Sequence, residues 1–330
     1  MSLLEVKDLY TFFRTKRGTV KAVNGVSYTL EEGKTLGIVG ESGSGKSVSA
    51  MSILRLLDGN GYIDKGEIIL EGTNLIKVSE NAMMHVRGNK ISVIFQEPMT
   101  SLNPVFTVER QIGEVFQIHQ GMSKKESYVK SVDLLREVGI PNPEKVAKTY
   151  PHQLSGGMRQ RVMIAMALAC KPRILIADEP TTALDVTIQA QILKLMNDLK
   201  KESNMAIIFI THDLGVINEM ADDVAVMYCG QIVEKAPVGV LFAHGKFSHP
   251  YTEGLMTSIP RLSTEKERLE AIPGSVPHPL DLPKGCKFCP RCKYATEKCQ
   301  NEEPDLIAVS DIQSVRCFYP DIEERKNGKK

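Results

Sequence analysis

A glycine-rich segment near the start of the chain contains the residue types that bind phosphate groups. It follows a predicted strand and opens a predicted helix at residues 47–57, which is the context that a phosphate loop needs. Glycines let backbone N–H groups wrap around phosphates, and a helix start adds partial positive charge. Lys46 would reach the β and γ phosphates of a nucleotide, and the Ser47 hydroxyl would hold magnesium. The segment consists of Gly40, Glu41, Ser42, Gly43, Ser44, Gly45, Lys46 and Ser47.

Two carboxylates come directly after another predicted strand, at residues 173–177. Asp178 could hold the magnesium ion through water, and Glu179 could polarise the attacking water. A pair of acids after a strand is usually a solvated turn, but a phosphate loop earlier in the chain favours a catalytic interpretation. Phosphoryl transfer is catalysed mainly by positioning and charge neutralisation, so a lysine, a hydroxyl on the metal and two such acids form a sufficient set.

A second possible anion cradle lies at residues 154–161, Leu-Ser-Gly-Gly-Met-Arg-Gln-Arg, just before a helical run at residues 162–169. Ser155 offers a hydroxyl, and Gly156 and Gly157 offer N–H groups at a helix start. This segment resembles the signature of ABC ATPases. In that family the signature grips the γ phosphate of ATP held by a partner subunit. The resemblance therefore implies that hydrolysis requires a dimer with nucleotide at its seam.

Three further segments match elements of that family in the expected order. Gln96, after a predicted strand, matches the glutamine that touches the magnesium ion and lies at the junction with a helical insertion. Residues 183–185, Ala-Leu-Asp, resemble the loop that crosses the dimer seam. His212 matches the histidine that contacts the γ phosphate and holds Glu179 and water in place. The resemblance thus implies a magnesium role for Gln96 and a catalytic role for His212.

The residue that stacks on adenine is less clearly marked. The family commonly supplies an aromatic ring ahead of the phosphate loop, and the nearest candidates are Tyr10, Phe12 and Phe13. Counting back from Gly40 leads nearer to Arg17 than to an aromatic residue. Two alternatives stay open: Phe13 stacks on the base, or the guanidinium plane of Arg17 does.

The elements that position these residues are those of an α/β fold. Up to about residue 243, short β-branched runs alternate with helical patterns, which predicts a mostly parallel sheet flanked by helices. Strands are expected at residues 34–39, 90–95, 173–177 and 206–210, each followed by polar or glycine-rich residues. The carboxyl ends of such strands form the edge at which ligands bind in this kind of fold.

Two other sequence patterns occur beside that of the parallel sheet. Residues 4–9 and 20–30 alternate like antiparallel strands, and residues 108–119 and 125–138 have helical periodicity. With the resemblance, the fold class is an α/β, P-loop ABC-type nucleotide-binding domain with a mostly parallel sheet and an antiparallel β subdomain. A helical subdomain is expected at about residues 98–165.

The nucleotide-binding domain is expected to span residues 1–245, and a small cysteine-rich accessory region to follow at residues 246–330. Prolines are frequent in this region, and it has no long periodic pattern of apolar residues. In a reducing compartment, crowded cysteines favour a metal over disulfides, and a metal would supply folding energy that a small core cannot. The crowded cysteines are Cys286, Cys289, Cys292, Cys299 and Cys317.

The resemblance narrows to the ATPases of oligopeptide and dipeptide importers and covers essentially the whole chain. Besides the phosphate loop and the cysteine tail, it rests on residues 95–104, Phe-Gln-Glu-Pro-Met-Thr-Ser-Leu-Asn-Pro, and on residues 249–252, His-Pro-Tyr-Thr. Importers of nickel and some sugars share parts of this pattern. The resemblance implies an ATPase that powers peptide import as a peripheral protein on the cytoplasmic face of the membrane. The implied partners are a second ABC ATPase subunit, identical or related, two membrane permeases and an extracytoplasmic peptide-binding protein.

The same resemblance implies a ligand set for the cysteines. The recurring positions of the family match Cys286, Cys292, Cys299 and Cys317, so a four-iron, four-sulfur (4Fe–4S) cluster on those four is expected, with Cys289 as a departure. The spacing of the first three cysteines also resembles iron–sulfur ferredoxin runs, although the closely following fourth cysteine and proline are absent. Two alternatives stay open: a tetrahedral zinc site that uses Cys289, and a thiol cluster without metal.

Composition argues against several other classes of protein. Lys plus Arg (41) nearly balances Asp plus Glu (40), and the formal net charge of +1 does not suit a nucleic-acid-binding protein. No stretch approaches the roughly 20 apolar residues of a spanning helix, and the N-terminus lacks the pattern of a secretory signal. The rival interpretations are a soluble ABC ATPase acting on DNA or in iron–sulfur assembly, and a nucleotide-binding module without turnover. Glu179 and His212 both argue against the second.

Overall fold

The computed structural model describes residues 2–96, 101–182, 184–243, 245–258 and 271–327. The chain forms two compact units, and each is described by itself. Unit 1 contains residues 31–34 and 77–210, and unit 2 contains residues 2–30, 35–76 and those from 211 onward. In the described part of the chain, no helix combines the length and the apolar character that crossing a membrane requires.

Unit 1 contains three parallel strands in the order β6-β7-β8. They are β6 (Ile91–Ile94), β7 (Ile174–Asp178) and β8 (Ala206–Thr211). Every residue of β7 and β8 is buried, as the β-branched runs in the sequence predict for a parallel sheet covered on both faces. The register places Ile174 of β7 opposite Ile91 on one side and opposite Ala206 on the other. The carboxyl end of β7, where the predicted acids lie, is therefore central in this group.

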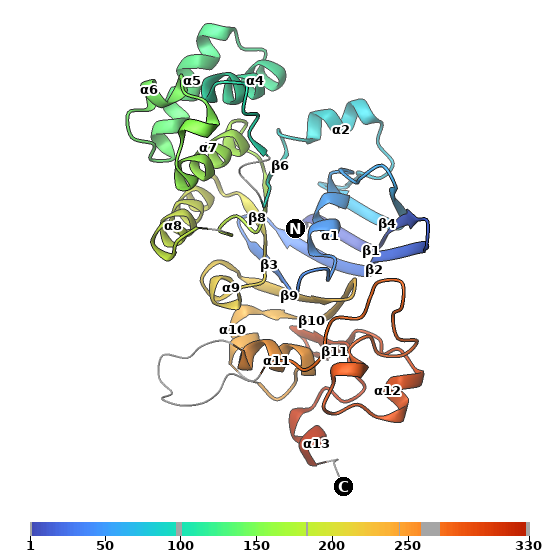
Figure 1. Ribbon diagram of the computed structural model, residues 1–330. Helices are drawn as coiled ribbons and strands as arrows, with labels where there is room; N and C mark the ends of the chain where they lie inside the picture. Colours follow the sequence, from blue (N-terminus) through green and yellow to red (C-terminus); the bar gives the residue numbers. More distant parts are fainter. Residues whose placement is uncertain (1, 97–100, 183, 244, 259–270, 328–330) are drawn as a thin grey trace. The chain divides into compact units, whose positions relative to one another are not determined.

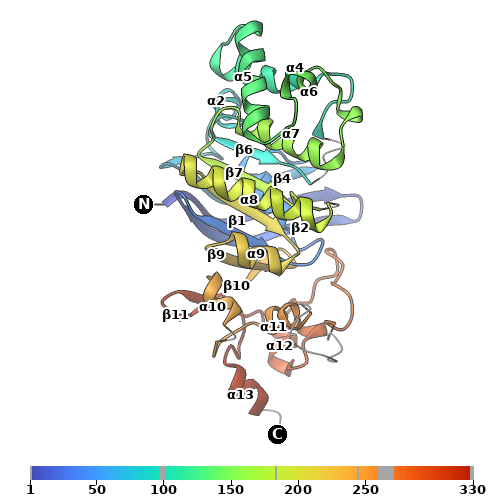
Figure 2. The same ribbon diagram turned by 90° about the vertical axis from the view of Figure 1, so that its left-hand side faces the viewer.

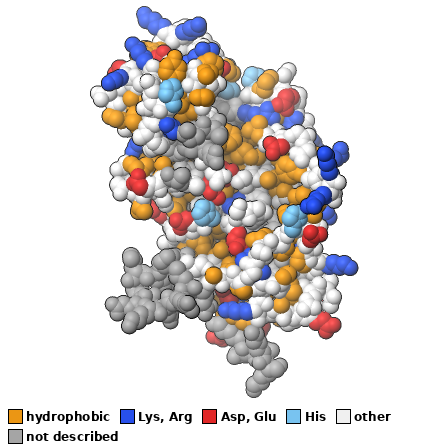
Figure 3. All heavy atoms as spheres, viewed as in Figure 1, with side chains coloured by type: hydrophobic (Ala, Val, Ile, Leu, Met, Phe, Trp, Pro, Cys, Tyr) orange, Lys and Arg blue, Asp and Glu red, His pale blue; other side chains and the backbone are white. Residues whose placement is uncertain are grey.

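Helices of unit 1 lie at both segments for which the sequence predicts helical periodicity, whereas the bounds of the expected helical subdomain stay a prediction. Helices α4, α5, α6 and α7 contact one another (Figures 1 and 2). The cap of α5 shows why the chain turns into a helix there, because Ser123 and Glu126 form a reciprocal capping box. Hydrophobic side chains nevertheless reach the surface of this helical part (Figure 3). The helices are α2 (Glu80–Val86), α4 (Val108–Gln120), α5 (Lys124–Glu137), α6 (Pro143–Ala147), η1 (Pro151–Gln153), α7 (Gly156–Leu168) and α8 (Val186–Ser203).

Unit 2 contains the predicted antiparallel strands. They form a sheet in the order β2-β1-β4-β5, in which Leu4 of β1 lies opposite Leu70 of β4. Two hydroxyl contacts tie helix α1 (Lys46–Ile53) to this sheet, one from Thr11 to Ser52 at 2.8 Å and one from Tyr28 to Ser49 at 3.3 Å. The strands are β1 (Ser2–Thr15), β2 (Gly18–Glu31), β4 (Gly61–Leu70) and β5 (Thr73–Asn74).

Five further strands of unit 2 follow the order β11-β12-β10-β9-β3. The parallel pair β3 and β9 carries the phosphate loop at the end of β3, and β9 turns into β10 through Cys229 and Gly230, both at positive φ. Two consecutive positive φ values are the mark of a tight hairpin turn. The strands are β3 (Thr35–Val39), β9 (Asp223–Tyr228), β10 (Gln231–Pro237), β11 (Ile307–Ser310) and β12 (Gln313–Val315).

The C-terminal part of the chain belongs to unit 2 and joins its strands. Strand β12 pairs with β10, where Val315 lies opposite Glu234. Figure 1 shows α11, α12 and α13 in orange and red at this end of the chain. The expected boundary between residues 245 and 246 stays a prediction. The short helices of unit 2 are α9 (Leu214–Met220), α10 (Val238–Phe242), α11 (Pro250–Thr257), η2 (Cys289–Arg291), α12 (Glu297–Asn301) and α13 (Ile322–Asn327).

Candidate functional site

The phosphate loop runs from the end of β3 into α1, as the sequence predicts. At Gly40 and Gly45 the backbone passes so close to its neighbours that a side chain has no room. A Cβ on Gly40 would lie 2.2 Å from the carbonyl oxygen of Met227, and one on Gly45 would lie 2.3 Å from that of Ala22. Gly45 also has a φ of 96°, which L side chains rarely adopt, so glycine is required at both positions.

Lys46 and Ser47 stand at the start of α1, directly after this loop. The Lys46 side chain is buried, and its ammonium group donates hydrogen bonds to the carbonyl oxygens of Gly40 at 2.7 Å and Glu41 at 3.1 Å. The lysine therefore bends back over the loop, where a phosphate group would meet its charge. Helix α1 ends at Ile53, earlier than the predicted Leu57, because Arg55 takes a positive φ of 54°.

The predicted acids lie at the end of β7 in unit 1. Asp178 is buried, with 6% of its surface exposed. Glu179 has a φ of 47°, a left-handed conformation that is unusual for a residue with a side chain. One of its carboxylate oxygens accepts hydrogen bonds from the Gln96 amide at 3.0 Å and the Thr182 hydroxyl at 2.9 Å. Sequence analysis missed Thr182, and its hydroxyl three residues after Glu179 is the signal that could have found it.

The signature segment forms the start of α7, also in unit 1. The Ser155 hydroxyl accepts a hydrogen bond from the N–H of Met158 at 3.3 Å and so caps the helix. Ser155 and Gly156 are exposed, and a Cβ on Gly156 would approach no atom closer than Leu184 at 4.0 Å. A Cβ on Gly157 would instead lie 3.0 Å from the Ile188 side chain. The exposed helix start can therefore accept an anion from outside the chain.

Of the remaining predicted residues, His212, Phe13 and Arg17 lie in unit 2, whereas the seam loop lies in unit 1. His212 is exposed between β8 and α9, and the next residue, Asp213, caps α9 through the N–H groups of Gly215 and Val216. Of the two candidates for adenine, Phe13 is half-buried against Gly61, whereas Arg17 is exposed in the turn between β1 and β2. The choice between them stays a prediction. Of the expected seam loop, Ala183 lies outside the described residues, and Asp185 caps α8 through the N–H of Ile188 at 3.0 Å.

The donor atoms of the expected magnesium ligands suit that ion. Ser47 supplies a hydroxyl oxygen, Gln96 an amide oxygen and Asp178 a carboxylate, and oxygen donors of this kind are the ones magnesium prefers. Because the Gln96 amide nitrogen donates to Glu179, its oxygen is the atom left to face a cation. The residues therefore fit magnesium together with a nucleotide.

The structure contradicts the prediction of a metal cluster in the cysteine tail. Among the described residues, no group of three or more His, Cys, Asp or Glu side chains is arranged to hold a metal ion. Burial raises the pKa of Cys286 to about 12 and that of Cys292 to about 11. The expected 4Fe–4S cluster on Cys286, Cys292, Cys299 and Cys317 and the alternative zinc site were both wrong.

The spacing of the cysteines gives their number but does not show that their side chains form a set of metal ligands, which is why it misled. All five line one small cavity of unit 2, yet the region is held together by other contacts. Its strand β12 extends the sheet, and Arg325 of α13 donates a hydrogen bond at 2.6 Å to Glu253 of α11. The accessory region thus has stabilising contacts that the argument from a small core did not foresee.

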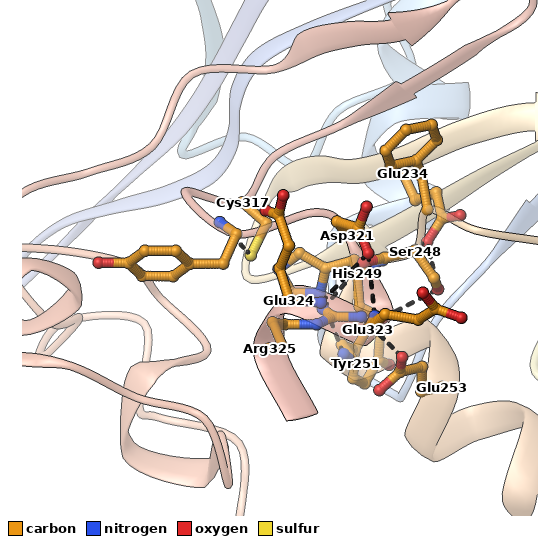
Figure 4. A network of polar contacts seen from close by, with 12 residues as sticks. Glu234, Ser248, His249, Tyr251, Glu253, Cys317, Asp321, Glu323, Glu324 and Arg325 are labelled. Atoms are coloured by element: carbon orange, nitrogen blue, oxygen red, sulfur yellow. Dashed lines mark hydrogen bonds and ion pairs between the residues drawn. The ribbon is translucent and has the colours of Figure 1, made fainter. Parts of the chain in front are cut away.

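A buried polar network anchors the start of α11 (Figure 4). The Glu234 carboxylate accepts hydrogen bonds from the His249 N–H at 2.8 Å, the Ser248 hydroxyl at 3.2 Å and the Gln313 amide at 2.9 Å. The Nδ1 atom of His249 accepts the N–H of Tyr251 at 3.0 Å. The His-Pro-Tyr-Thr segment, which sequence analysis used only as a family marker, is therefore a helix cap fixed to the sheet.

Acidification should destabilise the protein through His249. Burial, aided by the positive charges of Arg325 and Arg316, lowers the pKa of His249 from 6.5 to about 3. Between these values the unfolded chain binds a proton that the folded chain rejects, so stability falls as the pH drops below about 6.5, by about 1.4 kcal/mol per pH unit. We expect His249 to remove roughly 2 kcal/mol from the unfolding free energy between pH 7 and pH 5.

The matched variant is His249→Asn, which keeps an acceptor for the Tyr251 N–H and cannot take up a proton. Denaturant unfolding at pH 7 and pH 5 measures the effect, and the loss on acidification should be smaller in the variant by that amount. Other groups titrate in both proteins and cancel in the comparison. Equal losses in the two proteins would show that His249 does not resist protonation in the folded state.

The sequence matches two family models, one described as ABC transporter over residues 23–182 and one as oligopeptide/dipeptide transporter, C-terminal region, over residues 233–299. The oligopeptide transport ATP-binding protein AppD of Bacillus subtilis is 54% identical over 318 residues, 96% of each chain. The dipeptide transport ATP-binding protein DppD of Escherichia coli is 47% identical, with 97% of each chain covered. Among solved structures, the dimeric post-hydrolysis state of the ATP-binding cassette MJ0796 with ADP and phosphate is 26% identical. The comparison with MJ0796 gives a TM-score of 0.65 and covers 71% of this chain and 98% of the MJ0796 chain.

Proposed function

Because the chain belongs to the family of ATP-binding proteins of oligopeptide and dipeptide ABC transporters, we propose that it hydrolyses ATP to power the import of small peptides. Similarity to AppD and DppD over nearly the whole chain supports the class of transported solute. The observation that carries the mechanism is the presence of two anion cradles, the phosphate loop at residues 40–47 and the capped start of α7 at Ser155. One nucleotide needs only the first of them.

The phosphate loop would bind the nucleotide phosphates through its backbone N–H groups. Lys46, already bent over the loop, would neutralise charge on the β and γ phosphates. Magnesium would supply further charge neutralisation at these oxygens, held by Ser47, Gln96 and Asp178. Phe13 or Arg17 would stack on the adenine ring.

Glu179 would polarise the attacking water. Its conformation supports this role, because Gln96 and Thr182 both donate to the same carboxylate oxygen and so fix the orientation of the carboxylate. A left-handed backbone at Glu179, held by the bond from its N–H to the Ile210 carbonyl at 2.9 Å, fixes the direction of the side chain. His212 would contact the γ phosphate and keep water and Glu179 in place.

The second cradle explains the proposed assembly. Ser155, Gly156 and Gly157 would grip the γ phosphate of ATP held by a second ABC ATPase subunit, either identical or related. Two membrane permeases and an extracytoplasmic peptide-binding protein would complete the transporter, with this chain peripheral on the cytoplasmic face and no nucleic acid involved. Large hydrophobic residues of the helical part support a protein partner there, since Val105 is 69% exposed and Ile118 68% exposed.

ATP hydrolysis by the reconstituted transporter tests the proposed solute. We expect the rate to rise several-fold when the binding protein is loaded with a dipeptide or an oligopeptide, and to stay at its basal level with nickel or a sugar. Stimulation by nickel or by a sugar, but not by peptides, would assign the chain to one of the related importers instead.

A further inference from the structure

Glu41, the second residue of the phosphate loop, is held by residues far away in the sequence. Its N–H donates a 2.8 Å hydrogen bond to the Tyr251 hydroxyl, and its carboxylate accepts both terminal nitrogens of Arg291, at 2.6 and 3.0 Å. Within the loop, the Glu41 carbonyl accepts the N–H of Ser44 at 3.2 Å and the Lys46 ammonium at 3.1 Å. The position of Glu41 therefore bears on the first turn of the loop and on the lysine that faces the phosphates.

Arg291 is built into the cysteine-rich region as a rigid donor. It ends the short helix η2 between Cys289 and Cys292, and its side chain is 4% exposed. Its Nε atom donates to the Pro273 carbonyl at 3.0 Å, which leaves the other two nitrogens for Glu41. The hydrogen bonds with Glu41 raise the pKa of Arg291 further, so the guanidinium group is charged at any physiological pH. A bidentate pair of this kind fixes direction as well as distance.

Tyr251 is fixed just as firmly. Its ring packs against Tyr228 and Phe288, with centroids 4.7 and 5.4 Å away. Its N–H is bonded to His249 Nδ1, so the network in Figure 4 extends through Tyr251 to the phosphate loop. Burial raises the pKa of Tyr251, which keeps its hydroxyl neutral and able to accept the Glu41 N–H.

We propose that Arg291 is a positioning residue for nucleotide binding, because its ion pair with Glu41 holds the phosphate loop in the conformation that accepts phosphates. This inference rests on the proposed role of the phosphate loop and adds the accessory region to the nucleotide-binding machinery. Without Arg291 the loop must be ordered when the nucleotide binds, which weakens binding. If the competent loop conformation falls to about a tenth of the population, the affinity falls about tenfold.

Calorimetric titration of the full chain with MgADP tests the proposal, because ADP binds without hydrolysis. Arg291→Met, which removes the charge and keeps the bulk, should weaken MgADP binding about tenfold. The affinity of Arg291→Lys, which keeps the charge and loses the bidentate geometry, should lie between those of Arg291→Met and the wild type. The control is Lys287→Met, four residues before Arg291. It breaks the 2.8 Å ion pair of Lys287 with Glu303 and should bind MgADP as the wild type does.

The unfolding temperature of each variant separates positioning from mere stability, since a structural role would lower that temperature and leave the affinity of the folded protein unchanged. Unchanged affinity in Arg291→Met overturns the proposal, and if that variant does not fold, unchanged affinity in Arg291→Lys does so. Glu41→Gln combined with Arg291→Met should bind no more weakly than Arg291→Met alone, and additive losses would contradict a shared action. Failure of the wild type to bind MgADP would instead reject the phosphate-loop assignment itself.

Discussion

Glu179→Gln should abolish ATP turnover while ATP binding is retained. Glutamine has the same shape and can still accept the hydrogen bonds that Gln96 and Thr182 donate to the Glu179 carboxylate. It lacks the negative charge that polarises the attacking water, so the loss of hydrolysis should be at least about a hundredfold. Because ATP would remain bound, the variant should accumulate as an ATP-bound dimer with its partner ATPase subunit.

Phosphate release from the assembled transporter measures the turnover, and sedimentation measures the dimer. The control is Glu202→Gln, which removes an exposed carboxylate from α8 in the same unit and should leave turnover unchanged. Full activity of Glu179→Gln would sink the proposed mechanism, because no other described residue has been assigned to polarise the attacking water.

Gly156→Asp should have an effect of similar size for a different reason. The position is exposed and has room for a side chain, since a Cβ would approach only Leu184, at 4.0 Å. An aspartate in the first turn of α7 even favours the helix, because it faces the positive end of the helix dipole. The same carboxylate would repel a phosphate group at the helix start, so turnover should fall by at least about a hundredfold.

The unfolding free energy of Gly156→Asp should be no lower than that of the wild type, which separates the effect from misfolding. Gly157 would be a poorer choice, because a Cβ there lies 3.0 Å from Ile188 and would disturb packing. The matched control is Gly239→Asp, at an exposed glycine with nothing within 4 Å of its Cβ position. If Gly156→Asp and the control turn over ATP at the same rate, the signature does not contribute to hydrolysis.

Sequence alone located most of the elements around the candidate site. The buried strands β7 and β8 are apolar up to their last residues, Asp178 and Thr211, so both their extent and their ligand-binding ends can be predicted from composition. The phosphate loop was equally predictable, because glycine is the only residue that fits at Gly40 and Gly45. Features of this kind depend on consecutive residues and can therefore be predicted from the sequence.

Contacts between distant residues could not be predicted in the same way. The pairing of Arg291 with Glu41 joins positions 250 residues apart, and no local pattern indicates that these two residues meet. The crowded cysteines favoured a prediction of metal binding in this segment, whereas Arg291 is the residue there that contacts the phosphate loop. Thr182 was missed because its role depends on the left-handed turn at Glu179, which the sequence does not show.

We propose that the signature of this chain binds a nucleotide held by another subunit. The most direct test is the MgATP affinity of Gly156→Asp in the Glu179→Gln background, at chain concentrations where sedimentation shows only monomers. We expect an affinity within about twofold of the Glu179→Gln parent, because the monomer holds ATP on its own phosphate loop alone. A loss of about tenfold or more in the monomer would contradict it, since the signature would then bind the nucleotide of its own chain.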